Sequence, residues 1–132
     1  MIRDLSLIRA IALVVESQSY SMDPKLHSKG IAIDGYTEDQ IAYHCGLMVE
    51  AELMTSVSTT HLKSERVEFL IGRLTWKGHD FLDAARNSTT WSKLTAKLKE
   101  KAIAVTFDSL MVLLRKAGEE IVQQGASYLG SI

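Results

Sequence analysis

The sequence predicts a mainly α-helical protein with one small β-hairpin. Over most of the chain, apolar residues recur at intervals of three and four, which is the spacing of one helical face. A single pair of short runs rich in β-favouring residues is joined by a polar segment, which is typical of two strands and their connection. At 132 residues, folding hides roughly two thirds of the unfolded surface, so the chain can bury a core as one compact unit.

The first helix is predicted over residues 3–17. Its inner face carries Leu5, Ile8, Ile11, Ala12 and Val15. The segment Ser17–Gly30 then mixes polar residues with the one proline, Pro24, so the helix ends and a polar connection follows. We expect a short strand at Ile31–Ile33.

The sequence TEDQ, Thr37–Gln40, predicts the start of a second helix. In a capping box, the threonine hydroxyl accepts a bond from the amide of the third helical residue, and the glutamine reaches back to the threonine amide. The inner face of this helix is predicted to carry Ile41, Cys45, Met48, Val49 and Leu53. The opposite side carries Gln40, Tyr43, His44 and Leu47, which are therefore candidate contact residues.

Two strands are predicted next, at Leu53–Val57 and Val67–Leu74, with Lys63 and Arg66 in the polar loop between them. Thr75 can cap the helix that follows. That helix begins near Trp76, and its inward residues are Phe81, Leu82 and Ala85.

Two further helices complete the predicted fold, at residues 90–101 and 107–124. Along one side, the first carries Trp91, Leu94 and Leu98. The second is capped by Thr106 and carries Leu110, Leu114, Ala117 and Ile121 at helical spacing.

The order of these elements resembles a winged helix-turn-helix-like domain with additional C-terminal helices, in which the hairpin is the wing. More closely, the segments IRDLSLIRAI, IDGYTEDQIAYHCGLMVEAELM, RLTWKGHDFLDAARNSTTW and VTFDSLMVLL together resemble an uncharacterised bacterial and prophage family, domain of unknown function family 2513. The resemblance covers most of the chain. It implies a winged-helix-like fold and, by analogy, a DNA-binding or regulatory role, and it supplies no catalytic residue or ligand.

The sequence departs from the family's pattern at two places. Glu52 stands where a glycine usually ends the helix before the wing, and glycine is favoured there because it adopts the left-handed conformation at little cost. A longer polar insert lies at Ser19–Lys29. We expect residues 1–88 to form the winged-helix-like domain. Residues 89–132 would form a helical extension, packed on it within a single compact unit or mediating dimerisation.

Composition is that of an ordinary globular protein, with 46% hydrophobic and 23% charged residues. One cysteine, Cys45, excludes an internal disulfide and suits a reducing compartment, so a cytoplasmic location is expected. The longest apolar run, Ile11–Val15, is far shorter than the roughly 20 residues of a membrane span, so we expect neither a signal peptide nor a membrane anchor. A net charge of -1 provides no broad basic field of the kind that marks nucleic-acid binders.

We expect no enzymatic activity, and therefore no catalytic residue, no metal and no cofactor. The stretch Leu74–Trp91 concentrates Trp, His and Asp, but His79 and Asp80 point about 100° apart on a helix and cannot easily share a substrate, so we interpret it as scaffold. The histidines and Cys45 lack the paired spacings of zinc sites, and no phosphate loop or nucleophile elbow is present. Cys45 is interpreted as a small buried residue.

The first functional hypothesis is a winged-helix protein that binds double-stranded DNA and acts as a prophage or bacterial transcriptional regulator. From Gly30 to Leu62 the chain contains acidic residues and no Lys or Arg, so the helix before the wing lacks the cations that hold phosphates. The candidate DNA contacts are Thr37, Gln40, Tyr43, His44, Lys63, Arg66, Arg73 and Lys77. Lys93, Lys97 and Lys101 share one helical face, which is either a solvated surface or a phosphate-tracking stripe.

The alternative hypothesis is a protein-protein interaction adaptor that keeps the winged-helix scaffold and binds no nucleic acid. Tyr43 and Leu47 form an apolar pair flanked by acids, which suits either a protein contact or burial under the C-terminal helices. The last helix carries a wide apolar arc of Phe107, Leu110, Met111, Leu113 and Leu114. Because this arc exceeds a single stripe, the helix is either deeply buried or shared with a second subunit, and of the two we expect a homodimer formed through the C-terminal helices.

Overall fold

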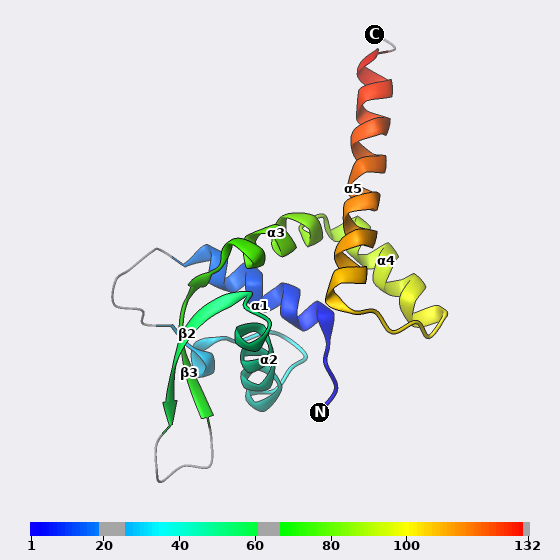
Figure 1. The fold of residues 1–132 in the computed structure, drawn as a ribbon. Helices are drawn as coiled ribbons and strands as arrows, with labels where there is room; N and C mark the ends of the chain where they lie inside the picture. The colour runs from blue at the N-terminus through cyan, green and yellow to red at the C-terminus, as the bar shows by residue number, and fades with distance from the viewer. Residues whose placement is uncertain (19–25, 61–66, 131–132) are drawn as a thin grey trace. The chain divides into compact units, whose positions relative to one another are not determined.

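The computed structural model describes residues 1–18, 26–60 and 67–130 (Figure 1). The chain divides into two compact units, Met1–Leu82 and Asp83–Ile132. Most of the described residues are helical, and one small sheet lies in the first unit. The predicted fold class, mainly α with a small hairpin, is therefore confirmed. The division into 1–88 and 89–132 stays a prediction, as does the packing of the extension.

In the part of the chain that the structure describes, the first unit contains helices, a short 3-10 helix and three strands. They are α1 (Leu5–Ser17), β1 (Leu26–His27), the short 3-10 helix η1 (Ser28–Gly30), α2 (Glu38–Glu50), β2 (Met54–Thr60), β3 (Val67–Leu74) and α3 (Trp76–Ala85), the last of which runs into the second unit. The second unit contains α4 (Ser88–Glu100) and α5 (Phe107–Gly130).

The three strands form an antiparallel sheet in the order β1-β3-β2. The hairpin of β2 and β3 follows α2 directly, which is the arrangement expected of a wing (Figure 1). The prediction of a strand at Ile31–Ile33 is wrong. The strand is β1 instead, and Ile31 lies after η1 with its amide bonded to the Ser28 carbonyl, so a turn takes the backbone group that a strand would have paired.

The hairpin is longer than predicted, because β2 continues to Thr60 and pairs there with Val67. The polar side chains of residues 58–60 suggested a loop, but Ser and Thr are tolerated on a hairpin arm, and threonine is β-branched. The connecting residues 61–66 lie outside the described part of the chain. Lys63 and Arg66 belong to that segment, so their predicted position in the wing loop stays a prediction.

The first helix begins at Leu5, two residues later than predicted, because Asp4 is its N-cap. The Asp4 carboxylate accepts hydrogen bonds from the amides of Ser6 and Leu7, at 2.9 and 3.1 Å. The predicted inner face is largely confirmed: Leu5 is only half-buried, and the buried residues are Leu7, Ile8, Ile11, Ala12 and Val15.

The predicted capping box of α2 is confirmed. The Thr37 hydroxyl accepts from the Gln40 amide at 3.2 Å, and the Gln40 side-chain oxygen accepts from the Thr37 amide at 2.8 Å. At the other end of α2, Glu52 takes the left-handed conformation with φ 62°. The amides of Glu52 and Leu53 bond back to the carbonyls of Val49 and Met48, so the tight turn forms without glycine.

Thr75 links the turn after α2 to the start of α3. Its hydroxyl accepts from the Gly78 amide at 3.0 Å, which confirms the predicted cap, and donates to the Glu52 carbonyl. A Cβ at Gly78 would overlap the carbonyl oxygen of Leu53, so the α3 backbone lies directly against this turn. The predicted inward residues of α3 are also buried: Phe81, Leu82 and Ala85.

In the second unit, α4 begins at Ser88, earlier than predicted, because the Asn87 side chain caps it by accepting from the Thr90 amide. Thr106 caps α5 as predicted. That helix continues to Gly130, six residues beyond the predicted end at residue 124. Of the wide apolar arc predicted on α5, Leu110, Met111 and Leu114 are buried, and Leu113 is exposed.

Candidate nucleic-acid interface

The candidate contact residues of α2 and its N-cap divide into three groups. Thr37 and Gln40 bond each other in the capping box, so the Gln40 side-chain oxygen already has a partner. Tyr43 is 43% exposed, and Leu47 is half-buried. His44, by contrast, is only 1% exposed. Tyr43 is therefore the residue of this predicted set that presents the most apolar surface to solvent.

The prediction that His44 lies on the outer face is wrong. Its Nε2 accepts the Asp4 amide at 2.8 Å, and its Nδ1 lies 2.7 Å from the Gln40 carbonyl oxygen. The Gln40 carbonyl can only accept, so this pattern assigns the ring proton to Nδ1. His44 also lies three residues after Ile41, a spacing that could have placed it on the inner face. A contact from His44 to DNA has no support in this geometry.

Asp4 forms hydrogen bonds with three segments of the first unit. Its amide bonds His44 of α2, and its carboxylate caps α1 and accepts the Tyr36 hydroxyl at 2.8 Å. The hydrogen bond to Asp4, followed by burial and by the Asp4 charge, raises the pKa of Tyr36. The neutral phenol is thus favoured as the donor. The cluster of Asp4, Tyr36 and His44 therefore has a structural role, because its hydrogen bonds connect parts of the fold.

Cys45 lies on the inner face of α2 and is fully buried, as predicted. Burial raises the pKa of its thiol to about 12, so the thiolate that a nucleophile or metal ligand requires is negligible near neutral pH. Among the residues that the structure describes, no group of three or more His, Cys, Asp and Glu side chains could hold a metal ion.

The exposed charges of α2 and its C-terminal turn are all acidic. They are Glu38, Asp39, Glu50 and Glu52. Glu38 and Asp39 lie in the first turn, where negative charge stabilises the helix dipole. The same charges repel phosphates, and α2 carries no Lys or Arg that could hold one.

A β-bulge turns Arg73 outward at the base of the hairpin. Met54 pairs with Leu74 and Ser56 with Ile71, so the bulged pair Gly72 and Arg73 faces the single residue Thr55. The Arg73 amide donates to the Thr55 hydroxyl at 3.1 Å. The exposed Arg73 side chain donates to the Leu74 carbonyl at 3.3 Å, which restrains the guanidinium near the end of β3.

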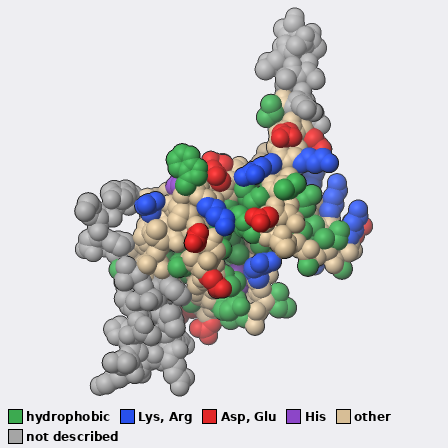
Figure 2. Space-filling view, viewed as in Figure 1, with side chains coloured by type: hydrophobic (Ala, Val, Ile, Leu, Met, Phe, Trp, Pro, Cys, Tyr) green, Lys and Arg blue, Asp and Glu red, His purple; other side chains and the backbone are tan. Residues whose placement is uncertain are grey.

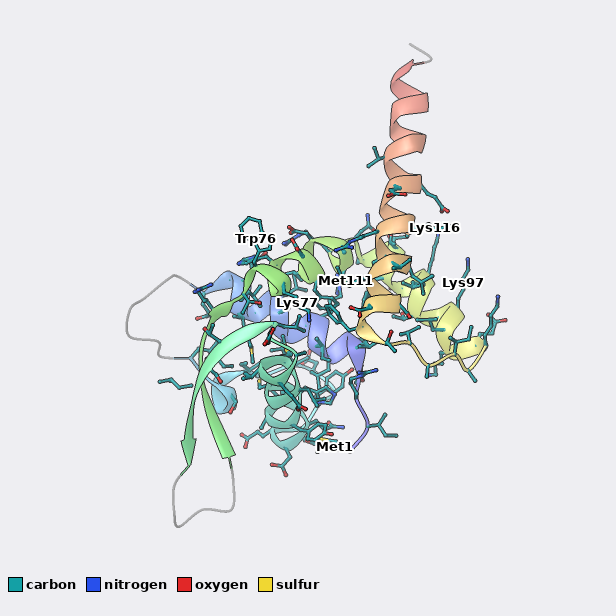
Figure 3. The ribbon with its side chains drawn as sticks, viewed as in Figure 1. Met1, Trp76, Lys77, Lys97, Met111 and Lys116 are labelled. Carbon is teal, nitrogen blue, oxygen red and sulfur yellow. The ribbon has the colours of Figure 1, made fainter. Side chains whose placement is uncertain are left out.

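Trp76 and Lys77 begin α3 directly after this bulge and are both exposed (Figure 3). Trp76 is 84% exposed, and its ring points away from the α3 ribbon. Arg73, Trp76 and Lys77 are called the wing-base surface below. The sequence predicts the two cations as candidate DNA contacts and Trp76 as part of the scaffold. The spacing contained a signal, since Trp76 is five and six residues before Phe81 and Leu82 and so is out of phase with the inner face.

The lysines of α4 form a separate basic surface in the second unit. Lys93, Lys97 and Lys101 are exposed, as either interpretation of the stripe requires. On the face shown in Figure 2, basic and acidic side chains are interspersed. The wing-base surface is therefore distinguished by its tryptophan, rather than by a high density of charge. No helix in the described part of the chain is long and apolar enough to cross a membrane.

Comparisons with known proteins identify relatives without a described activity. Residues 2–104 match the family described as "Hypothetical protein (DUF2513)". The chain is also similar to a protein of Haemophilus influenzae (strain ATCC 51907 / DSM 11121 / KW20 / Rd) named "Uncharacterized protein". The two are 29% identical over 124 residues, which cover 94% of this chain and 98% of the relative. No solved structure matches the chain.

Proposed function

The chain belongs to the DUF2513 family, whose match extends over residues 2–104, and we propose that it binds DNA, as a prophage or bacterial regulator would, through the wing-base surface instead of α2. One observation carries this proposal. Arg73 at the end of β3 and Lys77 in the first turn of α3 are both exposed, whereas the exposed charges of α2 are acidic. Lys63 and Arg66, which stay predicted contacts, belong to the segment between β2 and β3 that lies outside the described residues.

Phosphate contacts from two to four cations supply affinity that depends on salt and carries little sequence information. The bulge supports such a contact at Arg73, because a guanidinium restrained near the backbone loses less conformational freedom when it binds a phosphate. On this proposal, Thr37, Gln40 and Tyr43 add at most polar contacts at the edge of the bound duplex. We therefore expect weak preference among DNA sequences.

Neutralising both wing-base cations tests the proposal. With Arg73→Gln and Lys77→Gln together, we expect weaker binding to a 20-base-pair duplex and a salt dependence about 1.8 units shallower in log K against log salt, since each lost phosphate contact removes about 0.9. Fluorescence anisotropy over a salt series measures both. The matched control is Lys93→Gln with Lys97→Gln, which changes net charge equally on α4. Equal losses in the two variants, or none in the first, would contradict the proposal.

A protein-interaction adaptor is the second candidate, and the exposure of Tyr43 favours it. The Tyr43 ring meets the buried His44 ring edge-on, with centroids 5.5 Å apart. This contact restrains the Tyr43 ring, so less side-chain entropy is lost on binding. Asp39 lies one helical turn before it and half-buried Leu47 one turn after. The combination suits an aromatic anchor with an acidic rim.

Replacing Tyr43 with alanine separates the adaptor from the DNA-binding proposal. If Tyr43 is the anchor, Tyr43→Ala should weaken capture of a partner protein by about thirtyfold, equivalent to about 2 kcal/mol, and leave duplex binding unchanged. Quantitative affinity capture with wild-type, Tyr43→Ala and Glu50→Gln baits measures this, the last being a control on the same helix. A partner captured equally by all three would argue against the adaptor.

A further inference from the structure

The two tryptophans of the chain have opposite environments. Trp91 is 5% exposed, whereas Trp76 is 84% exposed at the first position of α3. Tryptophan is highly buried on average, and an exposed one is typical of a residue that binds a partner. The residues around Trp76 indicate which kind of partner an exposed indole at this position fits.

The α3 positions around Trp76 do not form an apolar docking patch. The positions one turn later on its side of α3 are His79 and Asp80, which are exposed and polar. The apolar residues of α3 lie on the other face, buried in the core. A protein interface normally centres on a contiguous apolar area, which is missing on this part of α3. Trp76 instead lies between two exposed cations along the chain, with Arg73 three residues before it and Lys77 directly after it.

This combination is the one that single-stranded nucleic acid requires. Bases stack on aromatic rings whatever their sequence, while Lys and Arg hold the phosphates on either side. In a continuous duplex the faces of the bases are covered by their neighbours, so an indole finds no base to stack on. We propose that Trp76 stacks on an unpaired base, and that the wing-base surface binds single-stranded DNA more tightly than duplex.

The charges near Trp76 also favour one side of the indole for the phosphates of the bound DNA. Asp80, one turn after Trp76 on α3, repels phosphates. Arg73 lies before it at the end of β3, and Lys77 lies beside it. Asp80 is also only three residues after Lys77, so its charge opposes a phosphate at Lys77 as well, and the phosphate beside the stacked base contacts Arg73. This inference rests on the proposed function, because it assigns a ligand class to the same surface.

Fluorescence of Trp76 tests the inference directly. In a Trp91→Phe background, Trp76 is the one remaining tryptophan of the chain, since the sequence has two. The probes are a fifteen-nucleotide oligo-dT and a blunt-ended hairpin duplex of similar length whose loop is a non-nucleotide glycol linker, so that it contains no unpaired base. We expect oligo-dT to quench Trp76 emission and to bind more tightly than the hairpin. If Trp91→Phe disturbs folding, the wild-type signal minus that of Trp76→Phe gives the same quantity.

Substitution of Trp76 gives an independent measurement. Trp76→Ala should weaken oligo-dT binding by about tenfold or more and change hairpin binding little, whereas Trp76→Phe should retain most of the affinity because phenyl rings also stack. Equal affinity for both probes with no effect of Trp76→Ala would overturn the inference. The proposed function would survive that result if hairpin binding still required Arg73 and Lys77. Binding of neither probe would overturn both.

Discussion

Replacement of Gly78 by alanine is expected to destabilise the first unit by about 3 kcal/mol or more. The new Cβ would overlap the Leu53 carbonyl oxygen, and both partners are backbone that no side-chain rotation can move aside. Relief requires α3 to separate from the turn after α2. That separation would strain the bonds from Thr75 to the carbonyls of Leu53 and Glu52. Urea unfolding monitored by circular dichroism measures the loss.

The matched control is Gly118→Ala in α5. A Cβ there has nothing within 4 Å, and alanine favours a helix over glycine by up to about 1 kcal/mol. We therefore expect this variant to be unchanged or slightly more stable. Wild-type stability in Gly78→Ala would mean that α3 does not lie against Leu53 as described.

Replacement of His44 by alanine should cost about 3 kcal/mol of unfolding free energy. The Asp4 amide would lose its acceptor, and the buried imidazole would leave a cavity in the first unit. Because the Asp4 side chain also caps α1 and binds Tyr36, the start of α1 should become less ordered. Thermal and urea unfolding measure the first effect, and hydrogen exchange at the Ser6 and Leu7 amides measures the second.

The neighbouring residue provides the control for His44. Tyr43→Ala removes a larger side chain from an exposed position, so it should cost less than His44→Ala. A His44→Ala protein with wild-type stability and reduced DNA binding would restore His44 as a contact residue. The expected result is the reverse, in which any loss of binding follows from loss of fold.

Helix starts were the most predictable feature of the sequence. The caps at Thr37, Thr75 and Thr106 were all found, because a cap depends on residues within three positions of each other. Asp4 and Asn87 cap helices by the same chemistry. The sequence predicts Asp4 inside its helix and does not predict the cap at Asn87, because apolar spacing near a helix end does not fix the first residue.

Features that depend on distant residues could not be predicted in the same way. The partner of His44 is the Asp4 amide, forty residues earlier, and β1 is a strand only because it pairs with β3. The outward turn of Arg73 depends on a bulge opposite Thr55. Prediction of the candidate interface therefore requires both the local sequence and knowledge of the tertiary packing. The two cations were found from their charge, whereas the burial of His44 and the exposure of Trp76 were not.

The ends of α2 and α4 also bear on how this protein can evolve. Both helices end in the same hydrogen-bonded turn, with Glu52 and Ala102 in the left-handed conformation at φ 62° and 52°. Codons for glutamate and alanine differ from glycine codons by a single nucleotide, and glycine removes the steric cost of this conformation. Each turn is thus one point mutation from a more stable form. The stability gained from such a glycine substitution can offset destabilising changes on the binding surfaces.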